Sequence, residues 1–317
     1  MESIGLPNQM PKAIDTGRRM ISHGHPGASK TMEICRLCQR SQAIENSHVT
    51  PSFVYRAIKF DSPTGFLRNP TNPNRRVQDG DKLPLLCAEC EQRFGKCERQ
   101  IAENIFEPFH ANDQDEFTYG PWLHYFATSL AWRALILDLP GLIADSENPR
   151  SIIERAVHAE ERMRTYLLGA TSIGASLNNH LFMSTKVTSA DAILAAAGPN
   201  WMTRRSVFGY TVIDQKRQFC GILHNLAGLM FFFIIKGNPR DLWRGTKISP
   251  IGGKLTQPQQ VSSWLAAELL NCVAEHSRFQ ENMSPNQRKI VADAVGKASP
   301  TRALRFRELD KTLNVET

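Results

Sequence analysis

The segments Cys35-Arg-Leu-Cys38 and Leu85-Leu-Cys87-Ala-Glu-Cys90 decide how the N-terminal third of this chain folds. Each cysteine pair can present two thiolates to one metal ion, and two pairs complete the tetrahedral ligand set of a structural Zn²⁺. The insert 62–82 between them is rich in Pro, Asn and Gly, which forbid a regular element and bury little apolar surface. A bound metal can supply the missing folding free energy. The sequence therefore predicts a zinc site with Cys35, Cys38, Cys87 and Cys90 as its ligands.

The alternative is that one of the two pairs is merely buried cysteine. Cys97 could compete as a ligand, but it has no second cysteine three residues away, as in the C-x-x-C pairs. Seven cysteines, four of them in C-x-x-C pairs, favour metal binding in a reducing compartment over a disulfide framework. The first residues lack an apolar signal core, and no stretch approaches the ~20 apolar residues of a membrane span. We therefore expect a cytoplasmic protein without a membrane partner.

The charge is distributed unevenly along the chain. The formal net charge is +7 over 317 residues, which is compatible with a polyanionic partner. Residues 1–110 carry net +3, residues 111–199 net −4 and residues 200–317 net +8. If nucleic acid binds, we expect the C-terminal third to supply much of the phosphate attraction.

The chain divides into three parts by composition. Residues 1–30 are rich in Gly, Pro, Ser and Lys, which predicts a flexible leader. We expect residues 31–110 to form the zinc module. We expect residues 111–317 to form a mixed helical and antiparallel-sheet domain that binds a substrate or a protein partner. Apolar spacing predicts helices beginning at Pro121, over 151–168, over 258–276 and after Ser284. The β-branched and aromatic runs 207–214, 219–226 and 229–237 predict antiparallel strands. The fold class is therefore α+β.

The residues around the two cysteine pairs carry a recognisable order of motifs. Between the pairs lies Glu45-Asn-Ser-His-Val-Thr-Pro51, and the second pair runs directly into Glu91-Gln-Arg-Phe. A C-x-x-C pair, then His-x-x-Pro, then Leu-Leu-Cys-x-x-Cys opening a helix, resembles the zinc-bound HNH endonucleases over about residues 33–97. That resemblance implies a treble-clef, ββα-metal module in which a histidine on the first strand activates water beside a Mg²⁺ or Mn²⁺ ion.

Three residues take the catalytic positions that the resemblance implies. His48 matches the general base, a task that suits imidazole because its unperturbed pKa of ~6.5 lies near working pH. Ser47 stands where the family has an aspartate ligand, and Glu91 stands where it has asparagine or histidine. Glu91 could coordinate Mg²⁺ through oxygen, whereas Ser47 is a poor substitute for a carboxylate. The alternatives are that His48 bonds a backbone group and that Glu91 is a solvent-facing carboxylate in the first turn of a helix.

The insert offers three arginines, Arg68, Arg75 and Arg76, suited to phosphate contacts. A solvated loop with incidental charge is the alternative. The partner expected from the resemblance is nucleic acid, DNA ahead of RNA.

Two functions follow from these motifs. The first is a metal-dependent endonuclease that hydrolyses phosphodiester bonds, of the kind found in mobile elements or phage defence. The second is a non-catalytic zinc-finger protein that binds nucleic acid or acts as a scaffold, with a degenerate HNH site. The chain contains no Walker A loop and no G-x-S-x-G motif, so nucleotide hydrolysis and serine hydrolase chemistry have no support.

Overall fold

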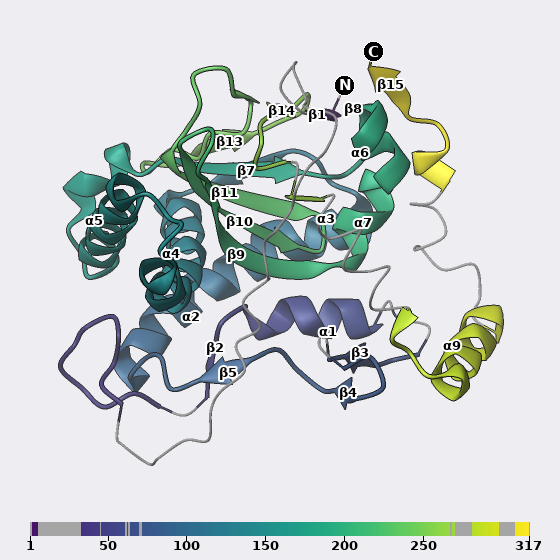
Figure 1. Cartoon of the computed structure of the whole chain (residues 1–317), viewed down its shortest axis with the longest axis horizontal. Helices are drawn as coiled ribbons and strands as arrows, with labels where there is room; N and C mark the ends of the chain where they lie inside the picture. The colour runs from purple at the N-terminus through teal and green to yellow at the C-terminus, as the bar shows by residue number, and fades with distance from the viewer. Residues whose placement is uncertain are drawn as a thin grey trace.

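The computed structural model describes residues 2–5, 33–44, 46–60, 62, 64–69, 72–266, 268–269, 281–297 and 308–316 (Figure 1). It combines helices with mainly antiparallel sheets, so the predicted α+β mixture is confirmed. Within the predicted leader, Glu2–Gly5 forms strand β1. The rest of the leader lies outside the described residues.

The cysteine pairs belong to a small β-pairing that leads into a long helix. Strand β2 (Ser47–His48) pairs antiparallel with β5 (Lys82–Leu83), and the chain then enters α2 (Ala88–Ile101). Helix α2 continues through a π-helical turn, Ala102–Phe106, into α3 (Glu107–Asn112).

The segment between β2 and β5 is more ordered than its composition suggests. It contains α1 (Ser52–Phe60) and a short hairpin of β3 (Leu67–Arg68) and β4 (Arg76–Val77). The hairpin lies within the insert 62–82, so the prediction that the insert contains no regular element is wrong. Backbone hydrogen bonds close the loop, since Asn69 N–H donates to Arg75 and Arg75 N–H donates to Asn72.

A four-stranded antiparallel sheet of order β7-β11-β10-β9 forms the centre of the molecule. Its strands are β7 (Asn179–Met183), β9 (Val207–Asp214), β10 (Phe219–Leu226) and β11 (Leu229–Lys236). Strands β9 and β10 coincide with the predicted runs, and β11 ends one residue before the third run does. Ala227 and Gly228 connect β10 to β11 with φ angles of 53° and 103°. Glycine suits the second position because positive φ is costly for other residues, and a Cβ there would lie 2.4 Å from Arg204 Cδ.

Both faces of this sheet are buried, which explains the nearly continuous apolar runs. Ile222 and Phe233 pack with helices α4 (Pro121–Ala144) and α5 (Arg150–Leu167). Leu223 and Phe232 point to the opposite face, where they belong to a second hydrophobic cluster that includes Leu265. The alternation follows the two-residue period of a strand.

Helix α4 is long and apolar enough to cross a membrane by length and composition, the one such helix among the described residues. The expectation that no stretch reaches this length is therefore wrong. Two thirds of its apolar window, 67%, is buried, and it carries the buried charged residues Arg133 and Asp138. It packs as a core helix between α2, α5 and the central sheet (Figure 1).

A second sheet of order β12-β14-β1-β8-β15 brings the two ends of the chain together. Its remaining strands are β8 (Val187–Asp191), β12 (Leu242–Arg244), β14 (Gln260–Ser262) and β15 (Asn314–Glu316). Strand β1 runs parallel to both β8 and β14, so this sheet is mixed rather than antiparallel. The predicted helix over 258–276 is wrong at its start, because Val261 is buried in β14, between β1 and β12; residues 270–280 lie outside the described residues.

The remaining elements complete the layers around the two sheets. Helices α6 (Ala192–Ala197) and α7 (Pro199–Arg205) follow β8, β6 (Phe117–Tyr119) pairs with β13 (Gly253–Leu255), and α9 (Pro285–Lys297) follows Ser284 as predicted. Apolar packing crosses the predicted domain boundary at residue 110. Cys87 and Phe94 share one cluster with Trp132 of α4, and Val54 of α1 shares another with Phe126.

Candidate metal centre and adjoining histidine

Four cysteines from two segments far apart in the sequence converge on one point. The group consists of Cys35, Cys38, Cys87 and Cys90, whose sulfur atoms all lie within 4.8 Å of one another. Cys38 Sγ lies 3.8 Å from Cys87 Sγ, and none of the four forms a disulfide. Four sulfurs bound at about 2.3 Å to a tetrahedral Zn²⁺ lie about 3.8 Å apart. The cluster therefore has the ligand type, number and spacing of a structural zinc site.

Local backbone geometry places both pairs. Cys35 N–H donates to Ser41 and Gln39 N–H donates to Cys35, and Gln39 adopts a positive φ of 57° that closes this turn. Cys87 is the N-cap of α2, and Cys90 lies in its first turn. Arg36 N–H donates to the Leu85 carbonyl at 2.9 Å, which ties the first knuckle to the second.

The electrostatics of the thiols also fit a bound cation. Burial raises the pKa of Cys35, and burial together with the neighbouring Cys87 and Cys35 raises that of Cys90. For Cys38 burial acts in the same direction, but the backbone N–H groups of Ser41 and Arg40 outweigh it and lower the pKa to about 6. Four clustered thiolates repel one another, and a divalent cation removes that penalty by coordinating them directly.

Ser47 has a structural position directly beside this cluster. Its side chain is fully buried, and its Oγ accepts a hydrogen bond from Leu86 N–H at 3.1 Å. Because Leu86 precedes Cys87, this bond connects β2 to the second knuckle. The Ser47 hydroxyl also lies near the Glu91 carboxylate and opposes the rise in the pKa of Glu91. Ser47 is thus occupied by contacts that hold the module together.

Glu91 does not face solvent as a first-turn carboxylate would. It is partly buried, and its Oε2 is fully enclosed without a hydrogen-bond partner among the described residues. Burial raises the pKa of Glu91, which the nearby Arg133 guanidinium opposes. The expected alternative of a solvated, dipole-stabilised carboxylate therefore does not describe it.

His48 lies at the surface of the same strand and contacts a carboxylate that sequence reasoning missed. Its Nε2 is 2.9 Å from Asp79 Oδ2, and the two side chains are 23% and 31% exposed. The Asp79 carboxylate also accepts a hydrogen bond from the N–H of the next residue, Gly80, and forms an ion pair with Lys82 Nζ at 3.2 Å. Asp79 is partly buried, but these donors outweigh that burial and lower its pKa to about 2, so it is ionised at neutral pH.

The His48–Asp79 contact can orient and polarise the imidazole. When Nε2–H donates to Asp79, the remaining ring nitrogen is free to accept a proton or a hydrogen bond. The pairing of His48 with Lys82 across β2 and β5 brings Asp79 within reach. The only sequence signal for this pair is an aspartate in the turn that precedes β5, and its use requires the strand register.

The residues around His48 give the predicted Mg²⁺ or Mn²⁺ site no support. Among the described residues, the four cysteines are the one group of three or more potential ligands that converge. The Ser47 hydroxyl accepts a hydrogen bond from Leu86 N–H, and Glu91 is the sole carboxylate at the positions that the resemblance marks. A catalytic ion needs several oxygen ligands around an open coordination position.

No protein-family model, curated protein or solved structure matches this chain. A cluster of four cysteines occurs in many kinds of zinc protein and is not specific to the HNH family. The resemblance drawn from the motifs therefore stays a prediction.

The three arginines of the insert have different environments. Arg68 donates from Nη1 to the Pro73 carbonyl at 2.9 Å and to Gln287 Oε1 at 3.0 Å, so it holds the hairpin to α9. Arg75 and Arg76 are exposed on the hairpin. The Arg76 guanidinium lies 4.3 Å from the centre of the Phe66 ring.

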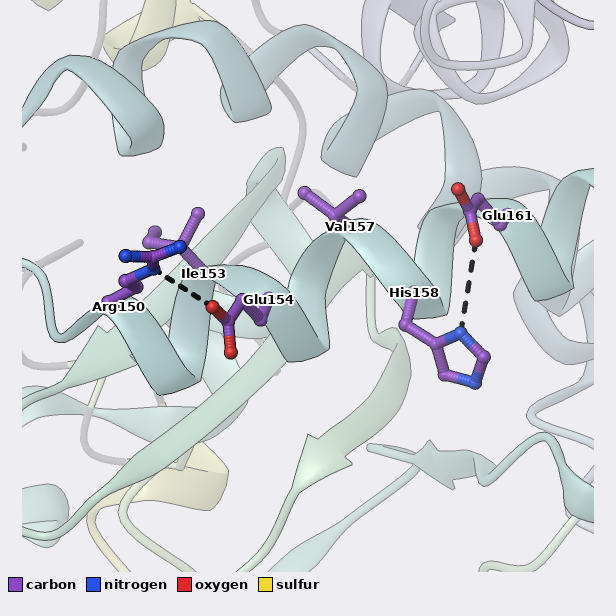
Figure 2. Close-up of a pocket in the computed structure, with 6 residues that line it drawn as sticks. All are labelled: Arg150, Ile153, Glu154, Val157, His158 and Glu161. Carbon is purple, nitrogen blue, oxygen red and sulfur yellow. Dashed lines mark hydrogen bonds and ion pairs between the residues drawn. The ribbon is translucent and has the colours of Figure 1, made fainter.

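A shallow hollow on α5 offers no comparable chemistry (Figure 2). It is lined by Arg150, Ile153, Glu154, Val157, His158 and Glu161, all from one helix. Its polar side chains pair within the helix, Arg150 with Glu154 at 3.0 Å and His158 with Glu161 at 3.9 Å. They do not converge on a common point, so the hollow is not a candidate site.

Proposed function

We propose that this chain binds nucleic acid through a zinc-stabilised module of the treble-clef, HNH-like type. The order β2, β5, α2 with a cysteine pair before β2 and another at the start of α2 supports the module type. The observation that carries the binding function is the charge on the outer segment of this module. Residues 52–78 contain five Lys or Arg residues and one Asp.

The Lys and Arg residues of this segment lie on a helix and a hairpin rather than on a loose loop. Helix α1 and the β3–β4 hairpin hold the cations, and α1 buries Val54 in the core below. Cations fixed on a rigid surface suit the phosphate backbone, whose contacts supply most of the affinity in sequence-independent binding.

Fluorescence anisotropy with labelled DNA and RNA tests the proposal. The zinc-loaded protein should bind at low salt, and the logarithm of its affinity should fall linearly with the logarithm of salt concentration. Replacing Arg75 and Arg76 together by Ala should weaken binding to every sequence and reduce the slope by about 2. The matched control is Arg150→Ala, an exposed arginine on α5. Absence of binding by zinc-loaded wild type at low salt would reject the proposal.

The second candidate function is phosphodiester hydrolysis, and the His48–Asp79 contact is the observation that favours it. A partly exposed imidazole whose one nitrogen bonds a carboxylate is placed to act as a general base toward water. A cleavage assay with single- and double-stranded DNA and RNA, with and without Mg²⁺ or Mn²⁺, tests this. Cleavage by wild type that is lost in zinc-loaded His48→Ala supports hydrolysis, whereas equal cleavage by both rejects His48 as the base.

A further inference from the structure

Helix α1 ends on an aromatic side chain that the fold leaves outside. Phe60, the last residue of α1, is 91% exposed. At the other end of the same helix, Phe53 packs edge-on against Phe106 at 4.9 Å between ring centres. One aromatic ring of α1 thus supports the core and the other faces solvent.

Phe60 stands beside the β3–β4 hairpin. The neighbouring Lys59 donates from Nζ to the carbonyl of Gln78 at 2.6 Å, and Gln78 directly follows β4. This bond fixes the end of α1 against the hairpin (Figure 1). Phe60 therefore lies near the hairpin that carries the exposed arginines Arg75 and Arg76.

One cation of this region, Arg76, stacks on an aromatic ring. The Arg76 guanidinium lies over the Phe66 ring at 4.3 Å, a stacked arrangement that restricts its plane. Alternation of aromatic rings with phosphate-binding cations is the composition of surfaces that bind single strands.

Helix α9 extends this surface and attaches directly to the hairpin. Ser284 N–H donates to Asn74 Oδ1 at 2.8 Å, and Asn74 Nδ2 donates to the Asn282 carbonyl at 3.3 Å. Lys289 on the first turns of α9 is exposed. The contact thus brings part of the basic C-terminal third next to the zinc module.

We propose that Phe60, Arg75, Arg76 and Lys289 form a surface for single-stranded nucleic acid, in which Phe60 stacks on an unpaired base and the cations contact the adjoining phosphates. This deepens the proposed function and rests on it. A lone exposed phenylalanine is common on protein surfaces, and the cations fixed beside Phe60 distinguish this one. Duplex nucleic acid hides the faces of its bases in the stack, so it gains nothing from Phe60.

Anisotropy with a labelled oligothymidylate, an oligouridylate and a DNA duplex of equal length tests this inference. Phe60→Ala should weaken binding of the single strands about tenfold and leave duplex binding unchanged, because stacking of one base contributes on the order of 1–3 kcal/mol. Ile251→Ala is the matched control, since Ile251 is 86% exposed and lies in the segment that connects β12 to β13. Because Phe60 is exposed, the variant should unfold at the same urea concentration as wild type.

The outcomes separate this inference from the proposed function. Equal losses for single strands and duplex, or no difference between Phe60→Ala and Ile251→Ala, overturn the stacking surface while nucleic-acid binding stands. Failure of wild type to bind any of the three probes overturns both. A loss confined to oligothymidylate or to oligouridylate supports the surface and assigns its preference to DNA or RNA.

Discussion

Arg133 on α4 and Glu98 on α2 form an ion pair with 2.5 Å between Nη2 and Oε1, and the Arg133 side chain has no exposed surface. The guanidinium also lies 4.7 Å from the centre of the Phe94 ring. The pair joins the helix that carries the second zinc knuckle to the helix that covers the central sheet. The segment that carries the four cysteines is therefore anchored to the rest of the chain by a buried charge as well as by apolar packing.

Removing the partner of Arg133 should cost more stability than removing Arg133 itself. Glu98→Gln leaves a buried cation with weaker compensation, which costs about 3 kcal/mol in comparable pairs. Arg133→Met removes the charge but keeps an apolar side chain, so its loss should be smaller. Urea unfolding of both variants measures the difference. The control is Arg150→Met in an exposed pair on α5, expected within about 0.5 kcal/mol of wild type. Equal losses of unfolding free energy in Glu98→Gln and Arg133→Met would contradict the idea that an uncompensated buried charge causes the larger loss.

Loss of one zinc ligand should unfold the module. Cys87→Ser removes a thiolate that no nearby group replaces, so bound zinc should fall from one equivalent per chain to a small fraction. The free energy of unfolding should drop by more than about 3 kcal/mol, since metal binding is coupled to folding. Metal analysis and urea unfolding measure the two effects. Cys97→Ser is the control, because Cys97 lies outside the cluster; retention of a full zinc equivalent by Cys87→Ser would contradict the assignment.

The parts of this structure that depend on local sequence are predictable. Strands β9, β10 and β11 can be predicted because their β-branched and aromatic runs end at turn residues. The cysteine cluster can be predicted because each C-x-x-C pair lies within four residues of the chain. Strand β14 reads as helix in the sequence, but pairing with β1 and β12 overrides its periodicity. Asp79 lies 31 residues from His48 and meets it only through the register of β2 and β5. Such contacts are set by tertiary pairing, which a single sequence does not specify.

Acid should destabilise the protein through its buried histidines. Burial lowers the pKa of His180 to about 3, whereas an unfolded histidine titrates near ~6.5. A folded pKa below the unfolded one contributes stability that is fully present above pH ~6.5 and is lost as pH falls from there toward about 3. The free energy of unfolding should therefore decline with pH over this window. His180→Gln should flatten the decline, whereas His158→Gln, at an exposed position, should leave it unchanged. If His180→Gln and wild type lose stability identically as pH falls, His180 is not a source of the acid destabilisation.

Replacing Gly209 by Ala should lower the stability of the protein, whereas replacing Gly95 by Ala should raise it. Gly209 on β9 lies opposite His224 on β10, and a Cβ there would lie 1.9 Å from His224 Nδ1. Because His224 is buried, it cannot move aside, so Gly209→Ala should destabilise by about 1–3 kcal/mol. A Cβ at Gly95 in α2 meets nothing within 4 Å, and Gly95→Ala should stabilise by about 0.5–1 kcal/mol through helix propensity. Urea unfolding checks both signs, and a double-mutant cycle with His224→Ala isolates the clash. The loss from Gly209→Ala should largely disappear in the His224→Ala background, and a loss of the same size there would place the strain elsewhere.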